Sequence, residues 1–319
     1  MTVLGDLVDS IFGGHNLHWL NGVIFIAILS VCAGMLVSIF KVRSRLSAIV
    51  LGICVVSFPP VASTLFYRFT SIYYGISIFL AIFAGYMIAN HKVKVAFPIA
   101  VICIALSMGI YQAYVSFTIS ILVILLLKMA LDNETTPKKI VVSGIYYVSV
   151  LALGASLYFL LMKLSLVAYD VVLSDYKGIN DMGISLSELP SLISSAFLPI
   201  LKLPLKDYED IAQTVFVRFC YLAIWIICAI RICILFFKKT KKAINIICSI
   251  IFCLILPAAI NFVVIMCGRQ MVYTLMLYPL VMILFIPVLL DEWLPKLEGK
   301  LELNFALSLI SIVPSIYAP

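Results

Sequence analysis

Charged side chains are scarce along this chain. Only 12% of its 319 residues are Asp, Glu, Lys or Arg, whereas 64% are hydrophobic, and the mean hydropathy is +1.20. A soluble globular domain carries about 25% charged residues, so the composition excludes that class and indicates a chain embedded mostly in a bilayer. The apolar runs are continuous, whereas the strands of a transmembrane barrel would alternate. The sequence therefore predicts an all-α, polytopic integral membrane protein.

Signals of several other protein classes are absent as well. The three histidines and nine cysteines show no zinc-ligand spacing, so we expect no cofactor, while a role for a divalent metal stays open. The N-terminus lacks the basic region, apolar stretch and cleavage site of a signal peptide. The net charge of +7 comes from short clusters between apolar runs, which favours the lipid bilayer over nucleic acid as a partner.

The apolar runs divide a single membrane domain, residues 1–319, into predicted spans. The longest run, Val95–Leu131, exceeds the roughly 20 residues that cross a bilayer core, and a polar break at Gly109–Tyr114 interrupts it. We therefore expect two short spans that fold back at this break. A weaker tenth span is predicted over Leu301–Pro319. The nine stronger spans are Leu20–Phe40, Leu46–Leu65, Ile72–Ala89, Val95–Met108, Ala113–Leu131, Ile140–Met162, Val215–Phe237, Ala243–Met266 and Met271–Leu290.

Basic residues sort to one side of these spans. If the spans alternate in direction, all five clusters of Lys and Arg face one side, which the positive-inside rule makes cytoplasmic. Tyr111 and Gln112 then lie on the outer side. Met1–Trp19 also lies outside, so either this short segment crosses unaided or an upstream helix is missing. The clusters are Lys41, Arg43 and Arg45; Lys92 and Lys94; Lys128, Lys138 and Lys139; Lys238, Lys239, Lys241 and Lys242; and Lys296 and Lys300.

The segment of residues 163–214 is too polar to span and is predicted to form a long external loop. Within it, Ser185–Ile200 keeps apolar residues near helical spacing. Ser185 and Glu188 have the separation of a capping box, and Pro190 suits the first turn of a helix. We expect an amphipathic helix that lies along the outer membrane interface.

The outer side gathers the polar residues that are candidates for chemistry. Arg68 and Arg269 lie on the face that positive charge otherwise avoids, where a guanidinium can bind a lipid phosphate; the alternative is an interfacial arginine without a ligand. Gln112 lies between two tyrosines in an apolar run and needs a partner, which is either a ligand or a structural group. Asp6 and Asp9 have no His or Ser partner at a diagnostic spacing, so solvated surface charges are the alternative for them.

Two stretches and one tripeptide carry a resemblance to a known family. FPPVASTLFYRF at Phe58–Phe69, LSMGIYQAYVSFTISILVILLL at Leu106–Leu127, and Gly268-Arg269-Gln270 resemble the type II branch of the O-antigen glucosyltransferases, which are GT-C-class enzymes of the bacterial inner membrane. The GIYQAY segment is the most specific element. The resemblance implies a GT-C-like membrane fold and the transfer of glucose from undecaprenyl-phosphate glucose to lipid-linked O-antigen on the periplasmic side.

The resemblance also implies roles for residues of this chain. Displacement of a polyprenyl phosphate requires a cation that stabilises the leaving group, for which Arg68 and Arg269 are the candidates. A single in-line displacement would invert the anomeric carbon. Tyr111, Gln112 and Gln270 complete the predicted substrate-binding set.

In this fold class the catalytic base comes from an acidic motif in the first external loop, after an N-terminal span. This sequence has neither that span nor a paired Asp-Asp, and Asp6 and Asp9 are the acids nearest to that position. The departure agrees with the missing upstream helix. It leaves the activity of the chain by itself open.

Two other functions stay open from the sequence. A transporter or flippase for a lipid-linked sugar would use the same outer face, although such proteins carry ionisable groups near the midplane and repeated broken helices, neither of which is evident here. A structural or immunity-type membrane protein without chemistry is favoured if the chain is full length and lacks a base.

Overall fold

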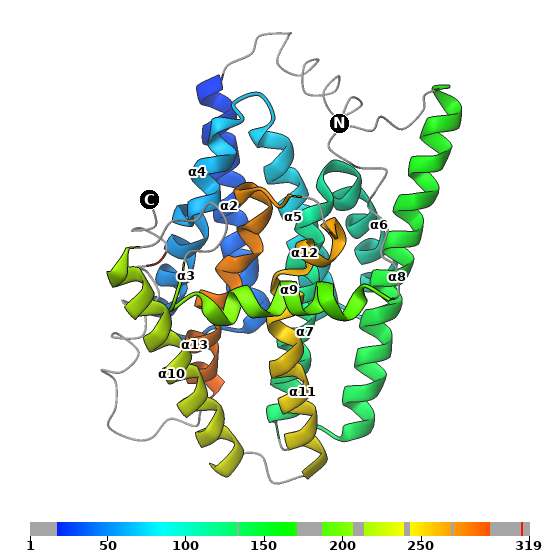
Figure 1. Ribbon diagram of the computed structural model, residues 1–319. Helices are drawn as coiled ribbons and strands as arrows, with labels where there is room; N and C mark the ends of the chain where they lie inside the picture. The colour runs from blue at the N-terminus through cyan, green and yellow to red at the C-terminus, as the bar shows by residue number, and fades with distance from the viewer. Residues whose placement is uncertain are drawn as a thin grey trace.

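Every regular element that the structure describes is a helix, which confirms the all-α prediction. The structure is a computed structural model, and it describes residues 18–132, 134–170, 187–206, 214–238, 243–268, 271–293 and 314. Figure 1 labels the α-helices among the elements given next, and the two 3₁₀ helices η1 and η3 lie between them in the chain. The elements are α2 (His18–Phe40), α3 (Arg45–Ser57), α4 (Pro59–Phe66), α5 (Ser71–Asn90), α6 (Val93–Tyr111), η1 (Gln112–Tyr114), α7 (Val115–Leu131), α8 (Pro137–Ala168), α9 (Leu189–Lys202), α10 (Val215–Lys238), α11 (Ala243–Ile260), α12 (Phe262–Cys267), η3 (Thr274–Val281) and α13 (Met282–Trp293).

The long apolar run folds back on itself as predicted. Eight segments of the described chain are helical, apolar and long enough to cross a membrane, and one of them is the whole of Val93–Leu131. Its backbone becomes extended at Tyr111, with φ −154° and ψ 105°. Before the turn, the hydroxyl of Ser107 in α6 donates to the carbonyl of Ser77 in α5 (2.9 Å); after it, the hydroxyl of Thr118 in α7 donates to the carbonyl of Ala81, also in α5 (2.7 Å). The helices α6 and α7 therefore form a hairpin beside α5.

The second predicted span is divided by its two prolines. Phe58 is extended because Pro59 disfavours the helical conformation at the preceding residue, so α3 ends at Ser57 and α4 begins with both prolines in its first turn. The predicted span Leu46–Leu65 is therefore two helices that meet at Phe58.

The helix α8 is longer than the predicted span Ile140–Met162. It runs for 32 residues, because the apolar residues beyond Lys163 continue the helix to Ala168 and an exposed lysine does not end it. The segment predicted to be a long loop therefore begins several residues later than predicted. One side of α8 packs against α6, where Gly154 lies against Ile104.

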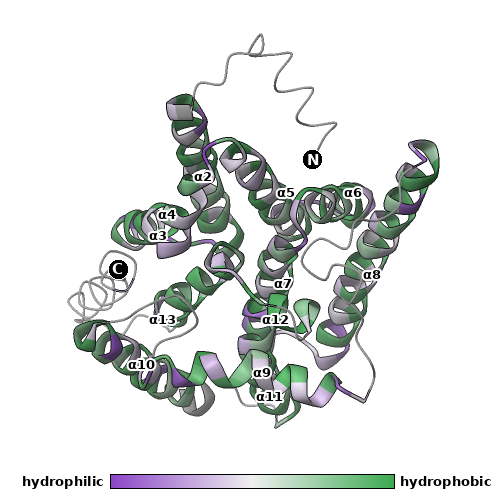
Figure 2. Ribbon diagram, turned by 45° about the horizontal axis from the view of Figure 1, so that its top comes forward, coloured by the Kyte–Doolittle hydropathy of each residue, from purple (hydrophilic) through white to green (hydrophobic). Residues whose placement is uncertain are grey.

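The amphipathic helix α9 crosses the molecule nearly at right angles to the long helices (Figures 1 and 2). It rests on α11 and α12 through Leu192 and Ala196, and the Asn261 amide donates to the carbonyl of Ala196 (3.0 Å). The predicted helix and its first-turn Pro190 are confirmed. The capping box is wrong, because Glu188 precedes the helix as its N-cap residue instead of lying in the first turn.

The last two predicted spans are interrupted or displaced. Ala243–Met266 breaks at Asn261 into α11 and α12, and the final span begins at Thr274 as the 3₁₀ helix η3 and continues to Trp293. Tyr278 of η3 is almost fully buried, and its hydroxyl donates to the carbonyl of Val55 (2.6 Å). The weaker tenth span, Leu301–Pro319, lies outside the described residues except for position 314.

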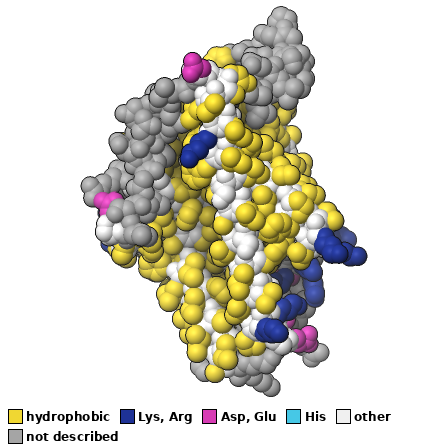
Figure 3. Space-filling model, turned by 90° about the vertical axis from the view of Figure 1, so that its right-hand side faces the viewer, with side chains coloured by type: hydrophobic (Ala, Val, Ile, Leu, Met, Phe, Trp, Pro, Cys, Tyr) yellow, Lys and Arg dark blue, Asp and Glu magenta, His cyan; other side chains and the backbone are white. Residues whose placement is uncertain are grey.

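Lys and Arg side chains gather toward one end of the bundle (Figure 3), where α2, α5 and α7 finish and α3, α6 and α8 begin. The ammonium of Lys128 in the last turn of α7 donates to the carbonyl of Phe40 (3.1 Å), which joins α7 to the last residue of α2 at this end. We name it the basic end, defined by residues 41–45, 92–94 and 128–139. It contains three of the five predicted clusters. Lys239–Lys242, Lys296 and Lys300 lie outside the described residues.

Candidate active-site cavity

A cavity of about 390 Å³ lies at the turn of the α6–α7 hairpin, away from the basic end. Its volume is within the range of roughly 300–1,000 Å³ that is usual for small-molecule sites. None of the described residues that line it is charged. They are Tyr67, Tyr74, Met108, Gly109, Ile110, Tyr111, Gln112, Ala113, Tyr158, Val263, Met266, Cys267, Met271, Tyr273, Leu275 and Met276.

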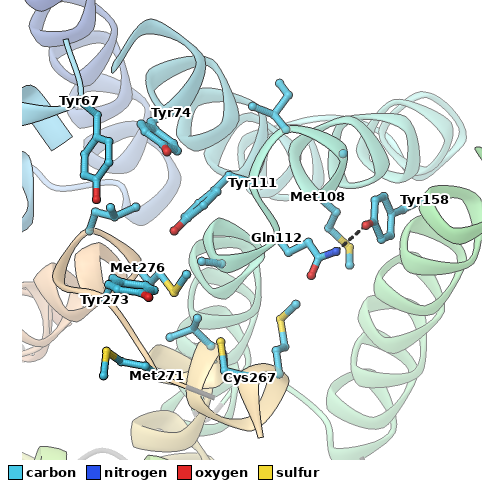
Figure 4. A pocket seen from close by; sticks show the side chains of 16 residues that line it. Tyr67, Tyr74, Met108, Tyr111, Gln112, Tyr158, Cys267, Met271, Tyr273 and Met276 are labelled. Carbon is cyan, nitrogen blue, oxygen red and sulfur yellow. Dashed lines mark hydrogen bonds between the residues drawn. The ribbon is translucent and has the colours of Figure 1, made fainter. Parts of the chain in front are cut away.

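Aromatic rings form one side of the cavity (Figure 4). The ring of Tyr111 lies edge-on to Tyr74 at 4.9 Å between centroids and 5.0 Å from Tyr114, and Tyr74 in turn lies 6.2 Å from Tyr67. Tyr114, fully buried behind them, donates to the carbonyl of Leu275 (3.3 Å) and joins the hairpin turn to η3. Such edge-to-face pairs restrain the rings, so this side of the cavity is a preformed surface of tyrosines.

Gln112 lies on the other side of the cavity. It begins the short η1 helix, directly after the extended residue Tyr111, and its Nε2 donates to the hydroxyl of Tyr158 on α8. Tyr158 in turn donates to the sulfur of Met162 (3.6 Å). Gln112 therefore has a structural partner, which is one of the two alternatives that the sequence left open, and it also lines the cavity.

The remaining wall comes from α12 and the residues after it. Gly268 ends α12 with φ +60°, a backbone conformation that residues with a side chain rarely adopt. Cys267 before this glycine and Met271 and Tyr273 after it all line the cavity.

The structure brings together only part of the predicted site. Tyr111 and Gln112 line the cavity. Arg68 does not: its side chain is exposed, and its carbonyl accepts a hydrogen bond from the Asn21 amide (3.1 Å), although its neighbour Tyr67 is a lining residue. Four other predicted site residues lie outside the described residues: Asp6, Asp9, Arg269 and Gln270.

Sequence reasoning missed Tyr158. This residue lies in the predicted span Ile140–Met162, to which no site residue was assigned. A signal was present, because Gly154, Tyr158 and Met162 follow one another at intervals of four residues and so share one face of α8. The glycine permits the close approach that brings the tyrosine to Gln112.

A family model described as Glucosyl transferase GtrII matches residues 3–284, a range that includes every described residue lining the cavity. No curated protein and no solved structure matches.

Proposed function

Because the chain belongs to the GtrII glucosyl transferase family and is thus a membrane glycosyltransferase, we propose that it transfers glucose from undecaprenyl-phosphate glucose to a sugar of lipid-linked O-antigen. The reaction would take place at the periplasmic face of the bacterial inner membrane. The observation that carries the proposal is the tyrosine- and glutamine-lined cavity at the hairpin turn, which lies within the matched range.

The lining suits a sugar in a membrane setting. A tyrosine presents an apolar ring and a hydroxyl, which fits the mixed surface of a pyranose, and five tyrosines line the cavity: Tyr67, Tyr74, Tyr111, Tyr158 and Tyr273. Gln112 adds an amide. A cavity with these groups favours a neutral sugar over an ion, because the described lining offers no charge to pair with one.

The phosphate of the donor needs a cation elsewhere. We assign Arg269 to this role, with Gln270 beside it. The residues two positions before and two positions after Arg269, Cys267 and Met271, both line the cavity. Arg68 is the second candidate, one residue away from the lining residue Tyr67. A guanidinium that pairs with the phosphate stabilises the charge that develops as the polyprenyl phosphate leaves.

The chemical step is a single displacement. The acceptor hydroxyl oxygen forms a bond to the anomeric carbon, the bond from that carbon to the phosphate oxygen breaks, and a carboxylate takes the hydroxyl proton. The anomeric configuration inverts. Asp6 and Asp9 are the candidates for the carboxylate.

A transfer assay tests the proposal. The purified protein in lipid nanodiscs is incubated with undecaprenyl-phosphate glucose carrying a radiolabel in the sugar, together with lipid-linked O-antigen. We expect label in the O-antigen with the wild-type protein and a loss of about 10²- to 10³-fold with Arg269→Ala, as for removal of one transition-state charge stabiliser. Arg43→Ala, an exposed arginine at the basic end, is the matched control and should retain full activity.

Two results would contradict the proposal. If Arg269→Ala transfers glucose as fast as Arg43→Ala, the assignment of the phosphate-binding residue is wrong. If the wild-type protein, reconstituted in sealed vesicles, moves the donor across the bilayer with its bond to phosphate intact and labels no acceptor, the function is transport.

A further inference from the structure

The amide of Gln112 has a donor end and an acceptor end, and a chain of hydrogen bonds decides which end faces the cavity. A thioether sulfur can only accept, so the single hydroxyl proton of Tyr158 goes to Met162. The oxygen of Tyr158 must then accept, and it accepts from Nε2 of Gln112. The sulfur of Met162 therefore sets the orientation of the Gln112 amide through the hydroxyl of Tyr158.

This orientation leaves the carbonyl oxygen Oε1 of Gln112 toward the cavity, as Figure 4 shows. Within the described part of the chain, Gln112 makes one side-chain hydrogen bond, the one to Tyr158, so Oε1 remains available to a ligand. A ligand that binds this oxygen must bring a proton. Sugar hydroxyls donate protons, whereas the non-bridging oxygens of a phosphodiester are ionised and only accept.

We propose that Oε1 of Gln112 accepts a hydrogen bond from one hydroxyl of the donor's glucosyl group, and that Tyr158 is the positioning residue that holds the amide in this orientation. This inference rests on the proposed function and adds the orientation of the donor. The glucosyl group lies against Gln112, and the phosphate lies away from it, toward the side where tyrosine hydroxyls can donate.

Deoxy donors test the inference. Transfer is measured with undecaprenyl-phosphate glucose and with its 2-, 3-, 4- and 6-deoxy analogues, each at several concentrations to give kcat/KM. We expect the wild-type protein to use one deoxy donor at least about tenfold less well than the others, because that donor leaves Oε1 without a partner. In Gln112→Met, kcat/KM for that deoxy donor should no longer fall below the values for the other deoxy donors. In Tyr158→Phe the preference among deoxy donors weakens, and Tyr158→Phe has no added effect on it when combined with Gln112→Met.

Tyr146→Phe is the matched control. Tyr146 is on the same helix, and its buried hydroxyl makes no hydrogen bond among the described residues, so this variant should keep the wild-type preference. Equal use of all four deoxy donors by an active wild-type protein would overturn the inference while leaving the proposed function standing. If the effects of Tyr158→Phe and Gln112→Met on the preference among deoxy donors multiply in the double variant, the positioning role of Tyr158 would be overturned. A wild-type protein that transfers no glucose from the unmodified donor would overturn both the function and the inference.

Discussion

The contact of Gly154 with Ile104 gives the sharpest test of how α8 is held in place. A methyl group added at Gly154 would lie 2.6 Å from Cγ2 and 2.8 Å from Cβ of Ile104, whereas ordinary contact begins at 3.4 Å. Gly154→Ala therefore pushes α8 and α6 apart by about 1 Å, and overpacking of this kind costs about 1–3 kcal/mol. At about 2 °C per kcal/mol for a chain of this size, the melting temperature should fall by about 2–6 °C.

The accessible thiols, such as the exposed Cys233, are first blocked, and unfolding is then followed with a thiol-reactive dye, because Cys32 and Cys54 are fully buried and react only when the helices separate. A fixed heating rate is required, since membrane proteins commonly unfold irreversibly. The matched control is Gly144→Ala on the same helix, where an added methyl meets no atom within 4 Å. This control should melt at or slightly above the wild-type temperature, because Ala favours a helix over Gly. Equal melting temperatures for the two variants would refute the close packing of α8 at Gly154.

Two more predictions concern the ends of the bundle. Arg231 and Asp291 form an ion pair (2.7 Å) between α10 and α13, and only 13% and 14% of their side chains are exposed. Removal of the guanidinium in Arg231→Ala should cost about 3 kcal/mol in thermal unfolding, and Arg231→Met combined with Asp291→Leu should regain most of it; a double variant no more stable than the single one would contradict this. A cysteine at position 67 or 43 can be labelled in a cysteine-free background with a membrane-impermeant thiol reagent applied to spheroplasts. Tyr67→Cys, whose native side chain is 47% exposed, should be labelled in intact spheroplasts, and Arg43→Cys only after lysis. The reverse pattern would place the cavity on the cytoplasmic side.

The hairpin and the amphipathic helix were predictable because each leaves a local pattern. A run as long as Val95–Leu131 cannot cross a bilayer once, and the polar residues at its centre locate the turn to within a few positions. In the same way, Pro190 and the helical spacing of apolar residues after it locate α9. Both features depend on residues that are close together in the sequence, so the sequence alone is enough to predict them.

Breaks and contacts that depend on distant segments were not predictable. Asn261 interrupts an apolar run without a proline or glycine beside it, and its amide bonds to Ala196 of α9, a contact between segments 65 residues apart. The far wall of the cavity, around Cys267 and Tyr273, likewise meets the hairpin only through tertiary packing. Sequence could identify Gln112 as a polar residue that needs a partner, but the partner, Tyr158, is set by how closely α8 approaches α6.

The length of α8 has a consequence for the lipid around the protein. Its 32 residues make a rod of about 48 Å, longer than the bilayer's hydrocarbon core of ~30 Å and close to the ~40–45 Å of a bilayer with its headgroups. A rod of fixed length answers a change in membrane thickness by leaning more or less steeply. Because α8 carries Tyr158 to Gln112, we expect acyl-chain length to alter how closely this tyrosine approaches the amide that we propose to bind the sugar, so that activity would differ between thin and thick membranes.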